Sequence, residues 1–415
     1  MAAGRLLAHE VADLCLGKPP LKSLSISATV RDALTVLKSI DDTHLSIWSC
    51  CHNYSSVSHQ SFIKNDCQCI GKICMVDIIC YLSKENNIKS PSLALDSPVS
   101  VLLSLDSVSV RHVDRATSLV EAIDLIIEGA QHLVVPISSR STMNSRRKQS
   151  SLHQELSSFA PTTHSGGIEF CWVTQEDVIR FLLSSIALFS PTAAFSVESL
   201  GIISPDILTV NYDSPASSAL GAIMTSLVDQ TSVAVIDDDD GLLIGEISPF
   251  TLAYCDETAA AAISTLSAGD LMAYIDCGGP PEEIMNLVEA RLKERNLKGM
   301  LDEFLAYSSG IPLIPSEFSS PSSSSSEDDE MSPYSSTMKA NNRFSRSSSY
   351  SARITRRAEA IVCYPGSSLV AVMIQAITHR VSYVWVIEED CSVVGIVRFS
   401  RMLEIFRAHL ERMIN

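Results

Sequence analysis

Two polar residues, Thr174 and Asp177, stand where an apolar stretch gives way to an amphipathic run in "CWVTQEDVIRFLL", residues 171–183. A threonine followed three residues later by an acid is close to a capping box, which satisfies free N–H groups in the first turn of a helix. The same groups can also hold a ligand, since a carboxylate accepts hydrogen bonds from hydroxyls and a helix N-terminus favours a nearby phosphate. A helix cap and a ligand site are therefore both open at this position.

The step from an apolar stretch into a helix occurs four times in the chain. The four copies are "GKICMVDIICYL" from Gly71, "CWVTQEDVIRFL" from Cys171, "GEISPFTLAYCD" from Gly245 and "GIVRFSRMLEIF" from Gly395. Upstream of each copy lie an extended apolar stretch, a short helical pattern and another extended piece. Each unit is therefore predicted to run strand, helix, strand, strand, helix.

The short helical patterns share one apolar stripe with the spacing i, i+3, i+4, i+7, which is one face of a helix. The stripes are Val30, Ala33, Leu34, Leu37; Leu119, Ala122, Ile123, Ile126; Ala216, Ala219, Leu220, Ile223; and Leu369, Val372, Met373, Ala376. A unit of this size buries little surface alone, so units are expected to pair. The sequence predicts an α/β fold of four β-α-β-β-α units in two pairs, packed as a disc-like body.

The four units differ mainly by insertions. We place repeat 1 at 5–83 with an insert at 50–66, repeat 2 at 97–190 with an insert at 138–167, repeat 3 at 195–265 and repeat 4 at 266–412. Repeat 4 is interrupted by a helix at 281–305 and a Ser-rich linker at 308–358, which we expect to be disordered. In that helix Pro281 marks the start, one face carries Ile284, Leu287, Val288 and Leu292, and Gly299 is expected to mark the end.

Composition indicates a folded soluble chain. Of its 415 residues 46% are hydrophobic and 19% charged, and the net charge is −17. An acidic chain is a poor candidate for binding nucleic acid or an anionic membrane, and the longest nearly uncharged apolar stretch contains Pro191 and is too short to span a bilayer. Without a signal sequence at its start, the protein is expected in the cytoplasm, with the nucleus as a second location, and with reduced thiols.

The repeated unit resembles the CBS domain, and an adjacent pair of units resembles a Bateman module. The order of motifs, including "LCLGKPPL" near the start and "LIGEISP" at residues 243–249, is similar to plant CBS-domain-containing proteins with four repeats. These belong to the wider group that includes the gamma subunit of the AMP-activated kinase. The resemblance covers nearly the whole chain except the inserts. Its motif is short, so the fourfold repetition carries the specificity.

The resemblance implies a role for the polar residues at the junction of the last strand and the helix in each repeat. In nucleotide-binding CBS repeats the acid of Gly-h-h-Thr/Ser-x-x-Asp bonds the ribose hydroxyls of an adenosine ligand, and the Thr or Ser helps at the phosphate side. Only repeat 2 keeps both polar residues, Thr174 and Asp177, with Cys171 in place of the glycine. The other repeats depart from the motif: Asp77 with Cys74 in repeat 1, Ser248 with Thr251 in repeat 3, and Arg398 with Arg401 in repeat 4.

In the family the pocket is shared within a pair, which implies three further positions. Trp172 would flank the base, or is a plain core residue, and Leu45 and Ser46 on the strand of repeat 1 would face the Asp177 pocket. Since a helix cap alone would favour cap-competent residues in every copy, the divergence of the motif suggests that at most one or two copies retain a ligand role. In repeat 4 Arg398 and Arg401 either contact phosphate or are solvated or paired with acids.

A group of soft ligands lies in and beside the first insert. It comprises Cys50, Cys51, His52, His59, Cys67 and Cys69. Such residues can bind zinc, but their spacing matches no standard C-x-x-C pair, so reduced cysteines without a metal are favoured. Another set, Cys74, Cys80, Cys255 and Cys363, falls on apolar faces and is expected in the core.

No P-loop, G-x-S-x-G, H-E-x-x-H or kinase signature occurs in the chain, so we expect no enzyme activity. The sequence favours a non-catalytic regulatory protein that senses an adenosine-type nucleotide and modulates a protein partner, a kinase or another enzyme. The candidate ligands are AMP, ADP, ATP and S-adenosylmethionine, with no other cofactor. The alternative is a ligand-free scaffold for protein–protein interaction, and assembly as a homodimer is left open.

Overall fold

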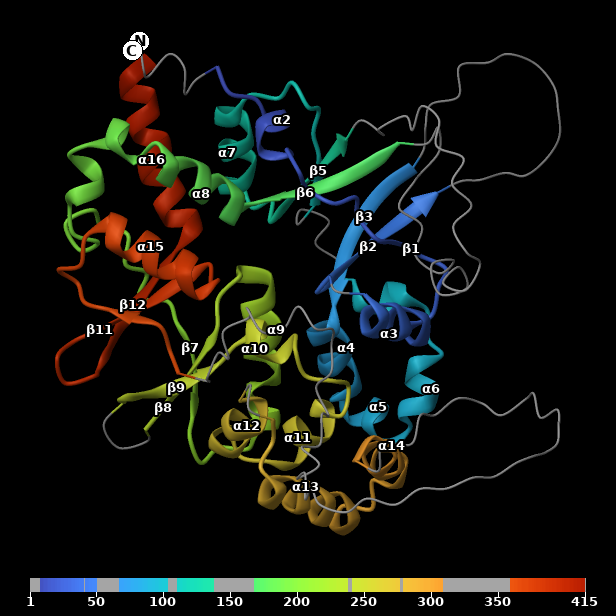
Figure 1. Ribbon diagram of the computed structural model, residues 1–415. Helices are drawn as coiled ribbons and strands as arrows, with labels where there is room; N and C mark the ends of the chain where they lie inside the picture. The colour runs from blue at the N-terminus through green and yellow to red at the C-terminus, as the bar shows by residue number, and fades with distance from the viewer. Residues whose placement is uncertain are drawn as a thin grey trace, which may run out of the picture.

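Each repeat folds into a three-stranded sheet with one common connectivity (Figure 1). The first and second strands of each sheet are parallel, and the second and third are antiparallel. The computed structural model describes residues 8–40, 42–50, 67–103, 110–137, 168–237, 241–276, 279–308 and 359–414. The strands are β1 (Ser23–Ser25), β2 (His44–Cys50), β3 (Cys67–Cys74), β4 (Val110–His112), β5 (His132–Ile137), β6 (Glu169–Thr174), β7 (Leu208–Asn211), β8 (Val233–Ile236), β9 (Leu243–Ile247), β10 (Val362–Cys363), β11 (Tyr383–Ile387) and β12 (Val393–Arg398). The predicted α/β fold of four units is confirmed.

A helix joins the parallel strands of each unit, and a second helix follows the third strand. The joining helices are α3 (Val30–Ser39), α7 (Leu119–Ile127), α9 (Leu220–Asp229), which follows a 3₁₀ turn at Ala216–Ala219, and α15 (Leu369–His379). The second helices are α4 (Met75–Leu82), α8 (Gln175–Ser184), α10 (Pro249–Leu252) with α11 (Ala259–Thr265), and α16 (Phe399–Ile414). The predicted apolar stripes of the joining helices are buried, apart from Leu220, which is partly buried. None of the described helices is long and apolar enough to cross a membrane.

The repeats pair through their sheets, 1 with 2 and 3 with 4. Between the first two sheets lies a small core of Leu21, Trp48, Cys69, Val110 and Val134. Helices then join the two pairs. In repeat 1, α4 contacts α9, α10 and α11 of repeat 3, and in repeat 2, α8 contacts α15 and α16 of repeat 4. An ion pair joins repeats 2 and 4, with Arg407 Nε 2.5 Å and Arg407 Nη2 3.1 Å from the two carboxylate oxygens of Asp124.

The segment that leads into each repeat packs on the other member of its pair. Four isolated β-bridges show this exchange, because each joins an entry segment to the start of the partner's joining helix: Glu10 to Ser118, Pro98 to Thr29, Ser196 to Ser368 and Ser267 to Pro215. The elements exchanged include α2 (Val11–Leu14), the 3₁₀ turn η1 (Val99–Leu102) and α12 (Ala268–Ile275). The boundary of repeat 4 at residue 266 remains a prediction, but α12 after it packs on repeat 3.

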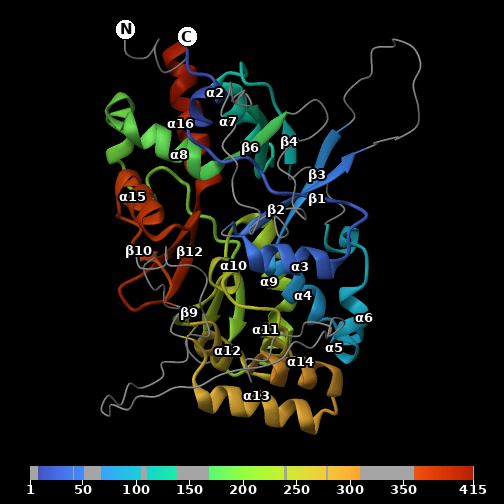
Figure 2. The same cartoon turned by 45° about the vertical axis from the view of Figure 1, so that its right-hand side comes forward.

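The helical insert in repeat 4 is two helices, α13 (Glu282–Glu294) and α14 (Lys298–Ser308). The expectation that Gly299 ends the helix is wrong. The break comes earlier, at Asn296 with φ of +57°, and Gly299 lies inside α14, where a Cβ would come within 2.9 Å of the Pro91 ring. Both helices lie at one end of the molecule, next to α11 and α5 (Glu85–Lys89) (Figures 1 and 2). The predicted linker beyond residue 308, and the inserts at 51–66 and 138–167, lie outside the described residues.

Candidate ligand-binding site

The capping box expected at the end of β6 is present. Thr174 Oγ1 accepts from the backbone N–H of Asp177 at 3.3 Å. In return, Asp177 Oδ2 accepts from the backbone N–H and from the hydroxyl of Thr174, both at 2.8 Å. Within the described part of the chain no donor reaches the other carboxylate oxygen, Oδ1. The box therefore occupies one oxygen of Asp177 and leaves the second for another partner.

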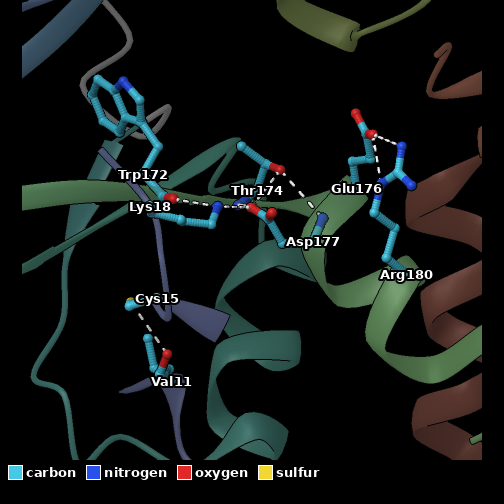
Figure 3. Close-up of polar contacts among 8 residues, drawn as sticks. All are labelled: Val11, Cys15, Lys18, Trp172, Thr174, Glu176, Asp177 and Arg180. Atoms are coloured by element: carbon cyan, nitrogen blue, oxygen red, sulfur yellow. Dashed lines mark hydrogen bonds and ion pairs between the residues drawn. The ribbon is translucent and has the colours of Figure 1, made fainter. Parts of the chain in front are cut away.

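Lys18, which the sequence analysis did not single out, binds the Thr174–Asp177 capping box. The ammonium of Lys18 donates to Asp177 Oδ2 and to the backbone oxygen of Trp172, the latter at 2.7 Å (Figure 3). The side chains of Lys18 and Asp177 are 22% and 23% exposed, so solvent screens the pair only in part. Lys18 lies on the segment between α2 and β1, and the exchange of entry segments brings it to repeat 2.

A cavity of about 190 Å³ lies beside the Lys18–Asp177 contact. Its wall combines the entry segment of repeat 1, the start of β2 and the end of β6: Lys18, Pro19, Pro20, Leu21, Lys22, Asp42, Thr43, His44 and Trp172. Trp172 is only partly buried, and its ring meets His132 edge-on at 5.2 Å. The wall between repeats 1 and 2 thus includes Trp172, two lysines and the carboxylate of Asp42, while Asp177 does not line the cavity itself and is reached through Lys18.

Leu45 and Ser46, expected to face the Asp177 pocket, are not among the residues that line this cavity. Leu45 is fully buried in the core between sheet and helices. Ser46 is fully buried too, and its hydroxyl donates to the backbone oxygen of Lys22 at 2.7 Å and accepts from the indole of Trp48 at 2.8 Å. Because side chains alternate along a strand, Leu45 faces away from His44. Ser46 shares the face of His44, but its hydroxyl is taken up by Lys22 and Trp48, and the cavity is lined by His44 at the start of β2.

The strand-to-helix step of repeat 1 is partly buried and holds both an acid, Asp77, and a lysine, Lys72. Asp77 accepts from the backbone N–H of Cys74 at 2.7 Å, and burial raises the pKa of this carboxyl above its usual range. Lys72 takes the strand position that Trp172 has in repeat 2 and lies 3.1 Å from His132 Nε2. Burial lowers the pKa of Lys72 to about 8, and burial, with Lys72 nearby, lowers the pKa of His44 to about 3.

In the second pair a buried polar network fills the equivalent space. Glu246 has the strand position of Trp172, two residues before the cap, and is 1% exposed. Its Oε2 accepts from the hydroxyl of Tyr383 and from the indole of Trp385, both at 2.9 Å. Tyr383 also lies 3.1 Å from the hydroxyl of Ser248, and both aromatic side chains are fully buried.

The arginines of repeat 4 differ in their surroundings. Arg401 is half exposed and pairs with Glu404 at 2.9 Å, which agrees with the acid-paired alternative. Arg398 lines a second cavity, of about 390 Å³, and its Nε is buried with no hydrogen-bond partner among the described residues. The other residues of that cavity are Asp206, Ile207, Leu208, Asp229, Thr231, Ser232, Trp385 and Ile396. In repeat 3, Thr251, at the acid position, is buried.

The cysteines expected in the core are placed there: Cys74, Cys80 and Cys363 are buried, and Cys255 is partly buried against the core. Residues 51–66, with Cys51, His52 and His59, lie outside the described part. Within that part, no group of three or more His, Cys, Asp or Glu side chains could hold a metal ion.

The fold and the site define a class: four β-α-β-β-α repeats, paired through their sheets, with a polar strand-to-helix step at each pair interface. No protein-family model matches the chain. The chain is 48% identical to CBS domain-containing protein CBSX5 of Arabidopsis thaliana over 413 residues, 98% of each chain. It is 28% identical to CBSX6 of the same plant over 432 aligned positions, covering 97% of this chain and 94% of that protein.

A solved structure has the same fold. Protein MJ1225 of Methanocaldococcus jannaschii, proposed as an archaeal homologue of g-AMPK, matches with a TM-score of 0.50 and 12% identity, over 96% of this chain and 100% of that chain. At this identity the likeness concerns the fold alone. The protein belongs to the CBS domain-containing proteins, as the identity and coverage with CBSX5 establish. The resemblance noted from the four repeated motifs is confirmed.

Proposed function

We propose that the protein is a non-catalytic regulator that senses an adenosine-type nucleotide between repeats 1 and 2 and passes its occupancy to a protein partner. The observation that carries this proposal is the position of Asp177. Its carboxylate stands at the N-terminus of α8 and binds the ammonium of Lys18, which lines a cavity together with Trp172. Carboxylate, ammonium and aromatic face are the partners that a ribose, a phosphate and a base require.

Binding would rearrange the Lys18 contact. The ribose hydroxyls would donate to Asp177, and the released ammonium of Lys18 would pair with the phosphate near the N–H groups of α8. The cavity of about 190 Å³ is smaller than the roughly 300–1,000 Å³ of typical small-molecule sites. The site would therefore have to open, and the change that we propose is release of the Lys18 side chain from Asp177.

This arrangement supplies a means of signalling. A ligand changes a protein's state only through different affinities for two conformations. The cavity wall comes from both repeats of the pair, so an occupied and an empty site would differ in how repeats 1 and 2 pack. A kinase or another enzyme that docks on this pair would respond to that difference.

The test is a thermal-shift screen of the full chain with AMP, ADP, ATP and S-adenosylmethionine. A ligand at a hundredfold excess over its Kd stabilises the fold by about 2.7 kcal/mol. We expect a rise in Tm with at least one nucleotide and no rise in Asp177→Ala. A rise of equal size in Asp177→Ala would contradict the role of the carboxylate.

A second candidate is a ligand-free scaffold for protein–protein interaction. It is favoured by the contacts that already satisfy Asp177 Oδ2 and by the buried Glu246 network in the other pair. This candidate predicts no thermal shift with any of the four ligands, together with retained partner binding in Asp177→Ala.

A further inference from the structure

The cavity of about 390 Å³ between repeats 3 and 4 is lined by a charged side chain without a partner. This side chain is Arg398, the last residue of β12. Within the residues that the structure describes, Arg398 makes no ion pair and its buried Nε has no hydrogen-bond partner. Leaving a buried donor unpaired costs free energy, and native proteins usually give such a group a partner. A molecule bound in the cavity would supply that partner.

Two acids and a hydroxyl line the same cavity. Asp206 lies on the entry segment before β7, Asp229 is the last residue of α9, and both are exposed. Thr231 is only 6% exposed. Among the described residues neither carboxylate pairs with Arg398, and the hydroxyl of Thr231 makes no hydrogen bond. The cavity therefore holds a cation, a hydroxyl and two carboxylates that do not bind one another.

The walls of this cavity are joined by hydrogen bonds that run between the two repeats. In the turn after α9, Gln230 has a φ of +54°, and its backbone oxygen accepts from the hydroxyl of Ser382 at 2.6 Å. On the entry segment, Ser204 exchanges two backbone hydrogen bonds with Ile396 of β12, both at 2.9 Å. The volume of about 390 Å³ falls within the roughly 300–1,000 Å³ of typical small-molecule sites. The cavity is therefore large enough for a small ligand as it stands.

We propose that this cavity binds a small molecule that carries an oxyanion at one end and hydroxyl or ammonium donors at the other. A guanidinium binds phosphate and carboxylate through charge-assisted hydrogen bonds, so Arg398 would hold the oxyanion, with a further hydrogen bond from Thr231. Asp206 and Asp229 would accept from the donors. Because the two acids repel a bare anion, a ligand with both parts should bind more tightly than inorganic phosphate.

The ligand of this cavity differs from the nucleotide proposed for the first pair. The motif position of Asp177 is taken in repeat 4 by Arg401, which pairs with Glu404 at 2.9 Å. In repeat 3 the same position is taken by Thr251, which is buried. Neither residue provides the carboxylate that the proposed ribose contact needs, so binding here does not depend on nucleotide binding between repeats 1 and 2.

The experiment is isothermal titration calorimetry of the full chain with no nucleotide present. The probes are glucose 6-phosphate, glycerol 3-phosphate and glutamate, which carry both parts, and inorganic phosphate, which carries the oxyanion alone. We expect at least one two-part probe to bind about tenfold or more tightly than inorganic phosphate, with the same affinity in Asp177→Ala. The sugar phosphates and glutamate distinguish a phosphate from a carboxylate as the oxyanion. No binding of any two-part probe, or binding no tighter than that of inorganic phosphate, would overturn the proposal.

Matched variants place the binding in this cavity. Arg398→Gln should weaken the two-part probe by about 10- to 100-fold. Arg401→Gln is the control and should bind as the wild type does, because Arg401 is half exposed and does not line the cavity. Equal affinity in Arg398→Gln and the wild type would overturn the proposal. If Arg398→Gln does not fold, the double variant Asp206→Asn, Asp229→Asn decides: it should lose the preference over inorganic phosphate, and an unchanged preference would refute the site.

Discussion

The two pairs of repeats share one architecture but use the space between their sheets in different ways. In the first pair the strand residue two positions before the cap of repeat 2 is Trp172, which is partly exposed and lines a cavity. In the second pair the matching residue of repeat 3 is Glu246, which is buried between Tyr383 and Trp385. At this strand position the first pair thus has a partly exposed aromatic residue and the second pair a buried polar network, while the cavity of the second pair lies elsewhere, beside Arg398.

The start of the middle strand shows the same contrast. His44 and His132 open β2 and β5 in the first pair, and both rings lie near Lys72. At the matching position of repeat 4 stands Tyr383, which is fully buried and donates its hydroxyl to Glu246. The first pair thus places two histidines and a lysine where repeat 4 has a fully buried tyrosine.

The largest effect is expected from truncating the aromatic residue of the closed pair. Trp385→Ala should lower the free energy of unfolding by about 3–5 kcal/mol, because it leaves a large cavity and removes a donor to Glu246. Trp172→Ala, the matched change in the first pair, should cost much less, since its ring is partly exposed. Urea denaturation of both variants checks this contrast, and equal losses would refute it.

The second-largest loss of stability is expected from replacing Glu246, the buried acid that accepts hydrogen bonds from Tyr383 and Trp385. Glu246→Leu leaves the buried indole N–H of Trp385 without its acceptor, at a cost of about 1–3 kcal/mol. Glu246→Gln keeps an acceptor oxygen and should lose less stability. If the two variants were equally stable, the hydrogen bonds would not be what holds the second pair closed.

The histidines of the first pair should make stability depend on pH. The folded pKa of His44 is about 3 and its ordinary value is 6.5, so between these values the unfolded chain binds the extra proton. Stability from this group is therefore full above pH 6.5 and is lost as the pH falls, with a slope of at most about 1.4 kcal/mol per pH unit. His132, whose pKa burial lowers further, acts in the same direction.

Asp77 opposes this trend, because burial raises its pKa and the folded state holds the proton more tightly. Chemical denaturation at pH 7.0, 6.0 and 5.0 should show a smaller loss of stability in His44→Leu than in the wild type. If both proteins lost the same free energy of unfolding between pH 7.0 and 5.0, His44 would not contribute to the pH dependence.

The smallest loss of stability is expected from removing the N-cap of α8, Thr174. Thr174→Ala should cost about 1 kcal/mol of stability, as the loss of an N-cap usually does, and should weaken nucleotide binding less than Asp177→Ala. Ser248→Ala is the matched control, because Ser248 caps α10 by accepting from the backbone N–H of Phe250 at 3.2 Å. A nucleotide response that fell equally in both variants would point to general destabilisation.

The repeats and their apolar stripes could be predicted because helix and strand periodicity depend on neighbouring residues. The box of Thr174 and Asp177 was visible for the same reason. Lys18 carried no such signal, since it reaches Asp177 only through an entry segment that packs on the other repeat. The sequence also did not show that the cavity is lined by His44, because which part of β2 borders it depends on how the two sheets pack.

The most direct test of the central claim is isothermal titration calorimetry with the nucleotide that gives the largest thermal shift. We expect one nucleotide site per chain, which is lost in Asp177→Ala. It should be retained in Arg401→Ala, which changes the same motif position in repeat 4. Binding that survives Asp177→Ala but disappears in Arg401→Ala would move the sensing site to the second pair. The absence of heat with all four ligands would contradict sensing by this protein altogether.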